Sequence, residues 1–295
     1  MGAAEYSAFE HLRQTLFWRD GDMIVPLAAY FDASGTKAEQ QVWAIGGWIA
    51  EVDQWSRFCG RWREMIKSAP FRPEVKPEKR IFHSAELESQ VGIYEGWTKT
   101  EKQNFQNEAF TIIEDLQLFP ISTAVVKADW DALNIRLPRL KQDHQGNYFV
   151  HAFHATMKNV QEWLRDQRVE ASVNYVFEAG DLGQPEIERA LHRAWEDPED
   201  RTFLHMSGWT MTGKHVLPLQ AADIWAYESY KHMINRVIGD RTRNVRYPYQ
   251  RLYHNVHEKY QTYWDRESLT AMIKTYREFE AAQKKDRDRK SGLTD

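Results

Sequence analysis

Hydrophobic positions recur along this chain with two different periods. Short apolar runs that end in polar turns predict β-strands, and they cover residues 23–32, 41–50, 119–128, 171–178 and 203–211. Between these runs, apolar residues repeat every third or fourth position, which predicts helices with one buried face. These helices cover residues 53–68, 98–116, 148–168, 186–195, 218–235 and 267–284.

The interleaving of strands and helices indicates an α/β protein. The first two strands are separated by a short polar turn, so we expect them to form an antiparallel hairpin within a mixed β-sheet flanked by helices on both faces. We expect residues 1–22 to form an N-terminal helical extension and residues 23–240 the main domain. Residues 241–295 should add a basic and aromatic loop and a C-terminal helix packed on the same domain.

Two local signals refine these elements. Asp53 is the predicted N-cap of the helix over residues 53–68, since a short acidic side chain accepts hydrogen bonds from the first turn. The pair Gly46 and Gly47 weakens the second strand but allows another backbone or side chain to approach it closely.

Composition limits the classes of function. The chain has 295 residues, 42% of them hydrophobic, and a formal charge of -4, so no global basic field marks a nucleic-acid binder, although a local basic stripe with bound metal is sufficient for one. The single cysteine, Cys59, excludes internal disulfides and cysteine-rich metal sites and fits a reducing cytoplasm. Without a secretory signal pattern or a run of about 18 apolar residues, we expect a cytoplasmic protein with no membrane span.

Three acidic residues stand in apolar surroundings where a charge is costly. Asp32 ends the first strand, Glu178 ends the strand over residues 171–178, and Asp223 lies within an otherwise apolar helix. If the three carboxylates converge, they predict a site for a hard divalent cation such as Mg or Mn, bound through oxygen. Each acid has a structural alternative as a turn former or helix-start residue, and Asp181 is a weaker ligand candidate.

Other polar residues near these acids are candidates for the same site. Lys127 could contact a phosphate or balance the acids, and the alternative is a strand-end lysine that reaches solvent. Gln220 shares a helix face with Asp223 and could bond a ligand or water, or simply start the helix. His83, with Glu86 nearby, could position a nucleophile or substrate, and the alternative is a structural histidine.

Two further patterns predict different chemistry. His151 and His154, with His83 or His144, could hold zinc, but no glutamate lies between the first pair and no cysteine supports them. Residues 239–251 interleave cations with aromatics, which suits phosphate contact and base stacking, and Arg243 and Arg246 are the predicted substrate contacts there. A solvated loop is the alternative for this stretch.

The order of motifs resembles a known family. Y-F-D-A-S-G, F-H-S-A-E, V-V-K, F-E-A-G and L-Q-A-A-D-I-W-A-Y follow one another as in the bacterial domain-of-unknown-function family 3800 of the ribonuclease H-like superfamily. The resemblance implies a ribonuclease H-like fold over the main domain, with Asp32, Glu178 and Asp223 as metal ligands and nuclease activity. Ser34 belongs to the first motif and is a predicted substrate contact. The family usually has glutamate where this chain has Ala33, which strand alternation turns away from Asp32.

Together, the residues and the resemblance predict a hydrolase. The expected function is phosphodiester hydrolysis of DNA or RNA at a carboxylate-held Mg or Mn centre, with Lys127 and His83 assisting. Two alternatives stay open. One is a non-catalytic nucleic-acid-binding or interaction protein with a degenerate site, and the other is a metal-dependent phosphoesterase that acts on nucleotides.

Overall fold

The computed structural model describes residues 27–134, 147–237, 244–253 and 260–290. The helix predicted over residues 1–22 lies outside the described residues. The strands are β1 (Leu27–Ser34), β2 (Val42–Glu51), β3 (Phe119–Val126), β4 (Val173–Glu178), β5 (Met206–Thr212) and β6 (Gln261–Trp264). The helices are α2 (Val52–Ser68), α3 (Ser84–Ser89), α4 (Lys99–Asp115), α5 (Lys127–Asn134), α7 (Tyr148–Gln167), α8 (Gln184–Glu196), α9 (Pro198–Phe203), α10 (Leu217–Val237), α11 (Tyr247–Tyr253) and α12 (Arg266–Lys290), with short 3₁₀ turns at Pro77–Lys79 and Gly92–Tyr94.

The strands form one mixed six-stranded sheet in the order β5-β4-β1-β2-β3-β6. β1, β2 and β3 are successive antiparallel neighbours, which confirms the predicted hairpin, whereas β4 lies parallel to β1, and β5 parallel to β4. β6 lies parallel to β3 at the opposite edge. The central position of β1 means that its last residues are flanked by strands on both sides.

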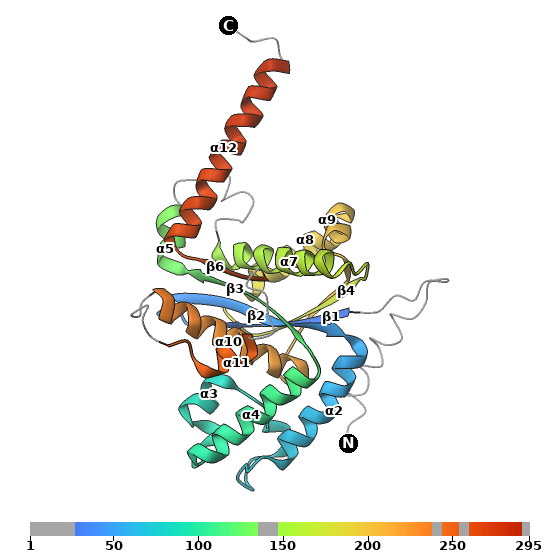
Figure 1. Cartoon of the computed structure of the whole chain (residues 1–295), viewed down its shortest axis with the longest axis vertical. Coiled ribbons are helices and arrows are strands. Elements are labelled where there is room, and N and C mark those ends of the chain that lie inside the picture. Colours follow the sequence, from blue (N-terminus) through green and yellow to red (C-terminus); the bar gives the residue numbers. More distant parts are fainter. Residues whose placement is uncertain (1–26, 135–146, 238–243, 254–259, 291–295) are drawn as a thin grey trace, which may run out of the picture.

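Helices cover both faces of the sheet, as the sequence predicts (Figure 1). On one face, α7 and α8 pack on apolar residues that include Phe31, Ile45 and Phe177. On the other, α2, α4 and α10 enclose a second core that includes Trp48 and Trp225. Both cores are dense in aromatic rings, and the sheet separates them.

Strand alternation decides which face receives the acidic residue of β1. Phe31 belongs to the core beneath α7 and α8, whereas Tyr30 belongs to the core on the α10 side. Asp32 therefore points to the α10 side. Ala33 packs against the opposite core, which confirms that it turns away from Asp32.

Helix α10 approaches the sheet unusually closely. A Cβ atom added at Gly46 would lie 2.8 Å from the Cα of Ala226, and one added at Gly47 would lie 1.8 Å from the carbonyl oxygen of Tyr30. Contacts this short are not sustained by real side chains, so the two glycines confirm the predicted close approach. Several apolar residues of α10, including Leu219, Ala222 and Trp225, are completely buried.

Several predicted boundaries differ from the structure. The N-cap of α2 is Glu51 and not Asp53, so the cap lies two residues earlier than predicted. The Gln54 side chain accepts a hydrogen bond from the Glu51 backbone N at 2.8 Å, which satisfies the start of the helix. Lys127 begins α5 instead of ending β3, since Trp130 of that short helix is buried in the core. The strand predicted over residues 203–211 begins at Met206, after α9.

Five of the described strands and α-helices were not predicted: the strand β6 and the short helices α3, α5, α9 and α11. β6 is four residues long and only partly buried, so it has too few positions to display an alternating pattern. α11 falls in the basic and aromatic stretch, where Tyr249 and Leu252 are buried although the surrounding residues are polar. This part of the stretch is therefore a short packed helix and not a solvated loop.

Candidate metal centre

Asp32 and Glu178 are brought together by the parallel pairing of β1 with β4. Phe31 lies opposite Phe177 in the register, so the acid that follows each of them stands at the carboxyl end of its strand. Asp32 is 2% exposed, and its Oδ1 accepts a hydrogen bond from the backbone N of Ala33 at 2.6 Å. Its Oδ2 is buried and accepts no hydrogen bond from the described residues.

Asp223 reaches the same place from α10. Its Oδ2 accepts a hydrogen bond from the backbone N of Ser84, the first residue of α3, at 2.6 Å. Its Oδ1 accepts a hydrogen bond from the side chain of Lys214 at 2.7 Å. The structure thus brings together the three acids that the sequence singled out, on the α10 side of the sheet.

The cation at the centre of this group is Lys214, which the sequence did not identify. Its Nζ lies 2.7 Å from Asp223 Oδ1, 3.2 Å from Asp32 Oδ2 and 3.2 Å from Glu178 Oε2, and its side chain is 12% exposed. It lies between β5 and α10. Its place shortly before the L-Q-A-A-D segment is the available sequence signal, but only the fold shows that its ammonium reaches all three acids.

A fourth acid belongs to the cluster. Asp181 follows β4, and its carboxylate, with those of Asp32 and Glu178, offers ligand oxygens that all lie within 4.8 Å of one another. The group of Asp32, Glu178 and Asp181 is an acidic cluster that could hold a metal ion. The weaker candidate of the sequence thus has a geometric position equal to that of the stronger ones.

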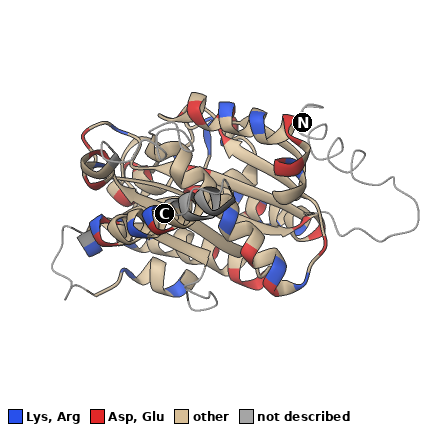
Figure 2. Ribbon diagram, turned by 90° about the horizontal axis from the view of Figure 1, so that it is seen from above, with Lys and Arg blue, Asp and Glu red and all other residues tan. Residues whose placement is uncertain are grey.

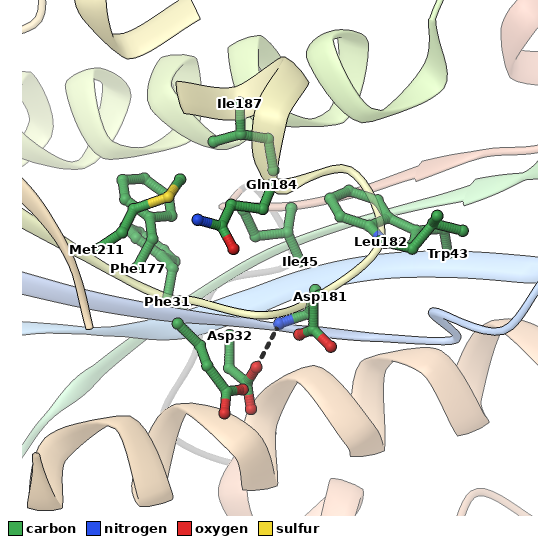
Figure 3. A pocket seen from close by; sticks show the side chains of 12 residues that line it. Phe31, Asp32, Trp43, Ile45, Phe177, Asp181, Leu182, Gln184, Ile187 and Met211 are labelled. Carbon is green, nitrogen blue, oxygen red and sulfur yellow. Dashed lines mark hydrogen bonds between the residues drawn. The ribbon is translucent and has the colours of Figure 1, made fainter. Parts of the chain in front are cut away.

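Asp32, Glu178 and Asp181 also line a small cavity at the strand ends, whose other lining residues are mostly apolar (Figure 3). This cavity has a volume of about 20 Å³, and its lining includes Ile45, Ile187 and Met211. Figure 3 shows the carboxylates of Asp32 and Asp181 turned away from these side chains. The acids therefore form a polar part of the cavity lining, and Asp32 and Glu178 each contact Lys214 Nζ at 3.2 Å.

Burial and charge perturb the acids in opposite directions. Burial raises the pKa of Asp32 well above its ordinary value, and Lys214 opposes this rise only in part. Burial, followed by the charge of Asp32, raises the pKa of Asp181 to about 7. Burial would also raise the pKa of Asp223, but Lys214 and His83 outweigh it and hold that pKa below its ordinary value.

The direction for Lys214 agrees with this arrangement. Burial alone would lower the pKa of its ammonium, but Asp223, Asp32 and Glu178 together raise it well above the ordinary lysine value. Lys214 is therefore a permanent cation. The charged form of Asp223 is stabilised more than that of Asp32, because Lys214 Nζ lies closer to Asp223 and because Ser84 donates an added hydrogen bond to it.

Gln220 supports the site from behind. Its Oε1 accepts hydrogen bonds from Trp62 Nε1 and from the backbone N of Phe82, each at 2.9 Å, and its Nε2 donates to the carbonyl oxygen of Lys214 at 2.8 Å. The residue is 1% exposed. Both the oxygen and the nitrogen of its amide are hydrogen-bonded to protein groups, in contrast to the predicted contact with a ligand. Gln220 is therefore a positioning residue.

Two residues at the ends of strands and helices occupy different surroundings. His83 is the N-cap of α3, and its charge contributes to the lowered pKa of Asp223, which places it beside the cluster. Lys127 is directed elsewhere, because its Nζ donates to the carbonyl oxygens of Gly35 and Lys37 at 2.9 and 2.8 Å. Lys127 therefore stabilises the turn after β1. This corrects the prediction that it contacts a phosphate or the acids.

The predicted substrate contacts lie apart from the acids or outside the described residues. Arg246 donates to both carboxylate oxygens of Glu228, at 3.0 and 3.1 Å, and also contacts Glu88 at 3.3 Å. Arg246 therefore has a structural role, in contrast to the predicted contact with substrate. Arg243 lies outside the described residues, and Ser34 is the last residue of β1, half-buried.

The zinc alternative has no geometric support in the described part of the chain. There, the only group of three or more potential metal ligands is the acidic cluster. His151 is buried on α7, where its ring lies against those of Trp130 and Trp264. His154 is on the same helix, where its ring lies against that of Phe153, and His144 is outside the described residues.

Basic and acidic residues are interspersed over the described chain, and neither sign forms a single continuous stripe in the view from above (Figure 2). None of the described helices combines the length and apolar character needed to cross a bilayer. Comparisons with models of protein families, with curated proteins and with solved structures found no match.

Proposed function

We propose that this chain is a cytoplasmic, Mg- or Mn-dependent nuclease that hydrolyses phosphodiester bonds of DNA or RNA. The observation that carries the proposal is the convergence of Asp32, Glu178 and Asp181, whose ligand oxygens lie within 4.8 Å of one another at the carboxyl ends of adjacent parallel strands. The motif resemblance to family 3800 supports phosphodiesters as the substrate class.

The donors suit a hard divalent cation. All of them are carboxylate oxygens, which Mg and Mn prefer to nitrogen or sulfur. The buried Oδ2 of Asp32 accepts no hydrogen bond from the described residues, so it retains its capacity as a ligand. Burial is the main cause of the raised pKa of Asp32, and the neighbouring acids Glu178 and Asp223 raise this pKa further, against the effect of Lys214.

The residues around the cluster have distinct roles in the proposal. A bound divalent ion would supply an activated water and stabilise charge on the phosphate. Asp32 and Glu178 would hold it rigidly, because both project from paired strands. Lys214 would place a fixed positive charge beside the phosphate, a role predicted from the sequence for Lys127. Ser84 and Gln220 keep Asp223 and Lys214 in place.

The direct test is a cleavage assay on single- and double-stranded DNA and RNA, with Mg, with Mn or with excess chelator. We expect cleavage of at least one substrate with metal and none in chelator. Asp32→Asn should abolish it, whereas Asp53→Asn, at an exposed position of α2, should leave it unchanged. Cleavage that persists in chelator, or no cleavage of any nucleic acid, would refute the proposal. The same panel includes mononucleotides, and their metal-dependent hydrolysis would identify a phosphoesterase.

One observation favours a different function. Three carboxylates around one buried ammonium also describe a closed ionic network, which would hold β1, β4 and α10 together without any reaction. Ala33, where the family usually has glutamate, fits such a non-catalytic nucleic-acid-binding or interaction protein. Calorimetric titration with Mn separates the two functions, because a closed network has no vacant ligand position and would bind no ion.

A further inference from the structure

The acidic centre consists of two halves that differ in how their oxygens are engaged. In one half, Asp32, Glu178 and Asp181 present oxygens to one another within 4.8 Å. The other half is Asp223, whose Oδ1 and Oδ2 accept short hydrogen bonds from Lys214 and Ser84, at 2.7 and 2.6 Å. A metal ion at Asp223 would have to displace a charge-assisted bond, whereas one at the first half would not.

Asp32 carries a second, independent sign of a ligand position in the first half. Its side chain is fully buried, and its Oδ2 accepts no hydrogen bond from the described residues. A buried carboxylate oxygen that has an ion pair but accepts no hydrogen bond is only partly compensated for its loss of hydration. The nearest cation, Lys214 Nζ, lies at 3.2 Å, farther than from Asp223, so this oxygen retains capacity for another cation.

Lys214 occupies the space between the halves. Its Nζ is within 3.2 Å of Asp32 and Glu178 as well as bonded to Asp223. Two-metal sites place their ions roughly 3.5–4 Å apart and bridge them by shared carboxylates. The Lys214 ammonium contacts Asp32 and Glu178, the acids that two ions would share, and also Asp223. It therefore stands where the second ion of such a pair would stand, and it repels a further cation from that place.

Formal charges lead to the same stoichiometry. The four carboxylates and the ammonium together carry three negative charges when all are ionised. One divalent ion reduces this to a single negative charge, which a buried site tolerates better than three. Without the ammonium, the four carboxylates would instead match two divalent ions.

We propose that the centre binds a single divalent cation through Asp32, Glu178 and Asp181, and that Lys214, anchored by Asp223, takes the place of a second metal ion. The inference rests on the proposed metal binding and adds its stoichiometry and ligand set. It also replaces Asp223 by Asp181 as the third ligand. Asp223 is then a positioning residue that acts through Lys214.

The test counts Mn ions bound to the full chain, by electron paramagnetic resonance of free and bound Mn together with calorimetry. Wild type should bind one ion, Lys214→Arg should also bind one, and Lys214→Met should bind two, with the spin coupling of a close Mn pair. Lys67→Met, at an exposed lysine of α2, is the control and should bind one. Asp181→Asn should weaken binding at least tenfold, whereas Asp223→Asn should change it by less than threefold.

The outcomes separate this inference from the proposed function. Two ions in wild type would overturn the inference while metal binding stands, and no ion at all would overturn both. One ion in a folded Lys214→Met variant would show that the lysine does not fill a metal position. A tenfold loss with Asp223→Asn but not with Asp181→Asn would restore Asp223 as the ligand. Circular dichroism establishes folding, and if Lys214→Met is unfolded, Lys214→Gln replaces it with the same expected count.

Discussion

Replacing Lys214 by methionine should destabilise the metal-free protein strongly at neutral and alkaline pH. The substitution keeps the length of the side chain but leaves Asp32, Glu178 and Asp223 without the ammonium that lies 2.7 to 3.2 Å from them. Removing one partner of a buried ion pair typically costs about 3–5 kcal/mol, because the remaining charge stays desolvated. We expect a loss of this size in the free energy of unfolding at pH 8.

This penalty should shrink as the pH falls. Without Lys214, the pKa of Asp32 rises further above its ordinary value and the pKa of Asp223 loses the main cause that lowers it, so the folded variant takes up protons at a pH where the unfolded chain binds none. Stability then increases with decreasing pH, by up to about 1.4 kcal/mol per pH unit for each proton taken up. In wild type the pKa of Lys214 is raised, so its stabilising contribution is fully present below the ordinary lysine pKa and does not vary over this range.

The assay is urea denaturation in chelator at pH 5.5, 7 and 8, followed by circular dichroism. Lys67→Met is the matched control, since that side chain is 75% exposed and surface substitutions change stability by only about 0.5 kcal/mol. Equal stability of Lys214→Met and wild type at pH 8 would refute the argument that the ammonium compensates the acids. A penalty that does not change with pH would show that lost packing, not charge, is responsible.

Three further substitutions test the supporting contacts by the same measurement. Gln220→Leu leaves buried N–H donors without an acceptor and should cost about 2–4 kcal/mol, while a loss below 1 kcal/mol would contradict its positioning role. Arg246→Ala isolates the buried Glu228 and should cost about 3 kcal/mol at pH 7. Because burial raises the pKa of Glu228, this cost should decrease toward pH 5, and a constant cost would argue against the ion pair. Gly46→Ala forces a Cβ against Ala226 and should cost about 1–3 kcal/mol; an unchanged midpoint would show that α10 can shift freely.

The sequence predicts the parts of this fold that depend on local patterns. Apolar runs mark all the central strands, and apolar periodicity marks the long helices α2, α4, α7 and α10. Asp32, Glu178 and Asp223 could be found because each is an acid in an apolar segment, where only a compensating partner makes burial tolerable. Gly46 predicted a close approach for a similarly local reason.

What the sequence could not predict depends on contacts between distant segments. Lys214 and Lys127 look alike as lysines next to strands, yet one reaches the acids and the other bonds the turn at Gly35. Arg246 lies in a stretch that resembles a nucleic-acid contact, but its partner Glu228 is on another helix. Which anion a long cationic side chain meets is decided by tertiary packing, because its charge can reach several neighbouring elements.

The close packing of α10 on β2 has a consequence for the lifetime of the folded state. Asp32, Glu178 and Lys214 come from segments far apart in the chain, and Asp223 joins them only when α10 has docked over Gly46. Contacts of this kind form late on the folding pathway, so an ion bound there should stabilise the native state more than the transition state. Mn should therefore slow unfolding while leaving the refolding rate nearly unchanged, and the centre would act as a kinetic lock on a sheet whose strands are otherwise held by backbone hydrogen bonds and packing.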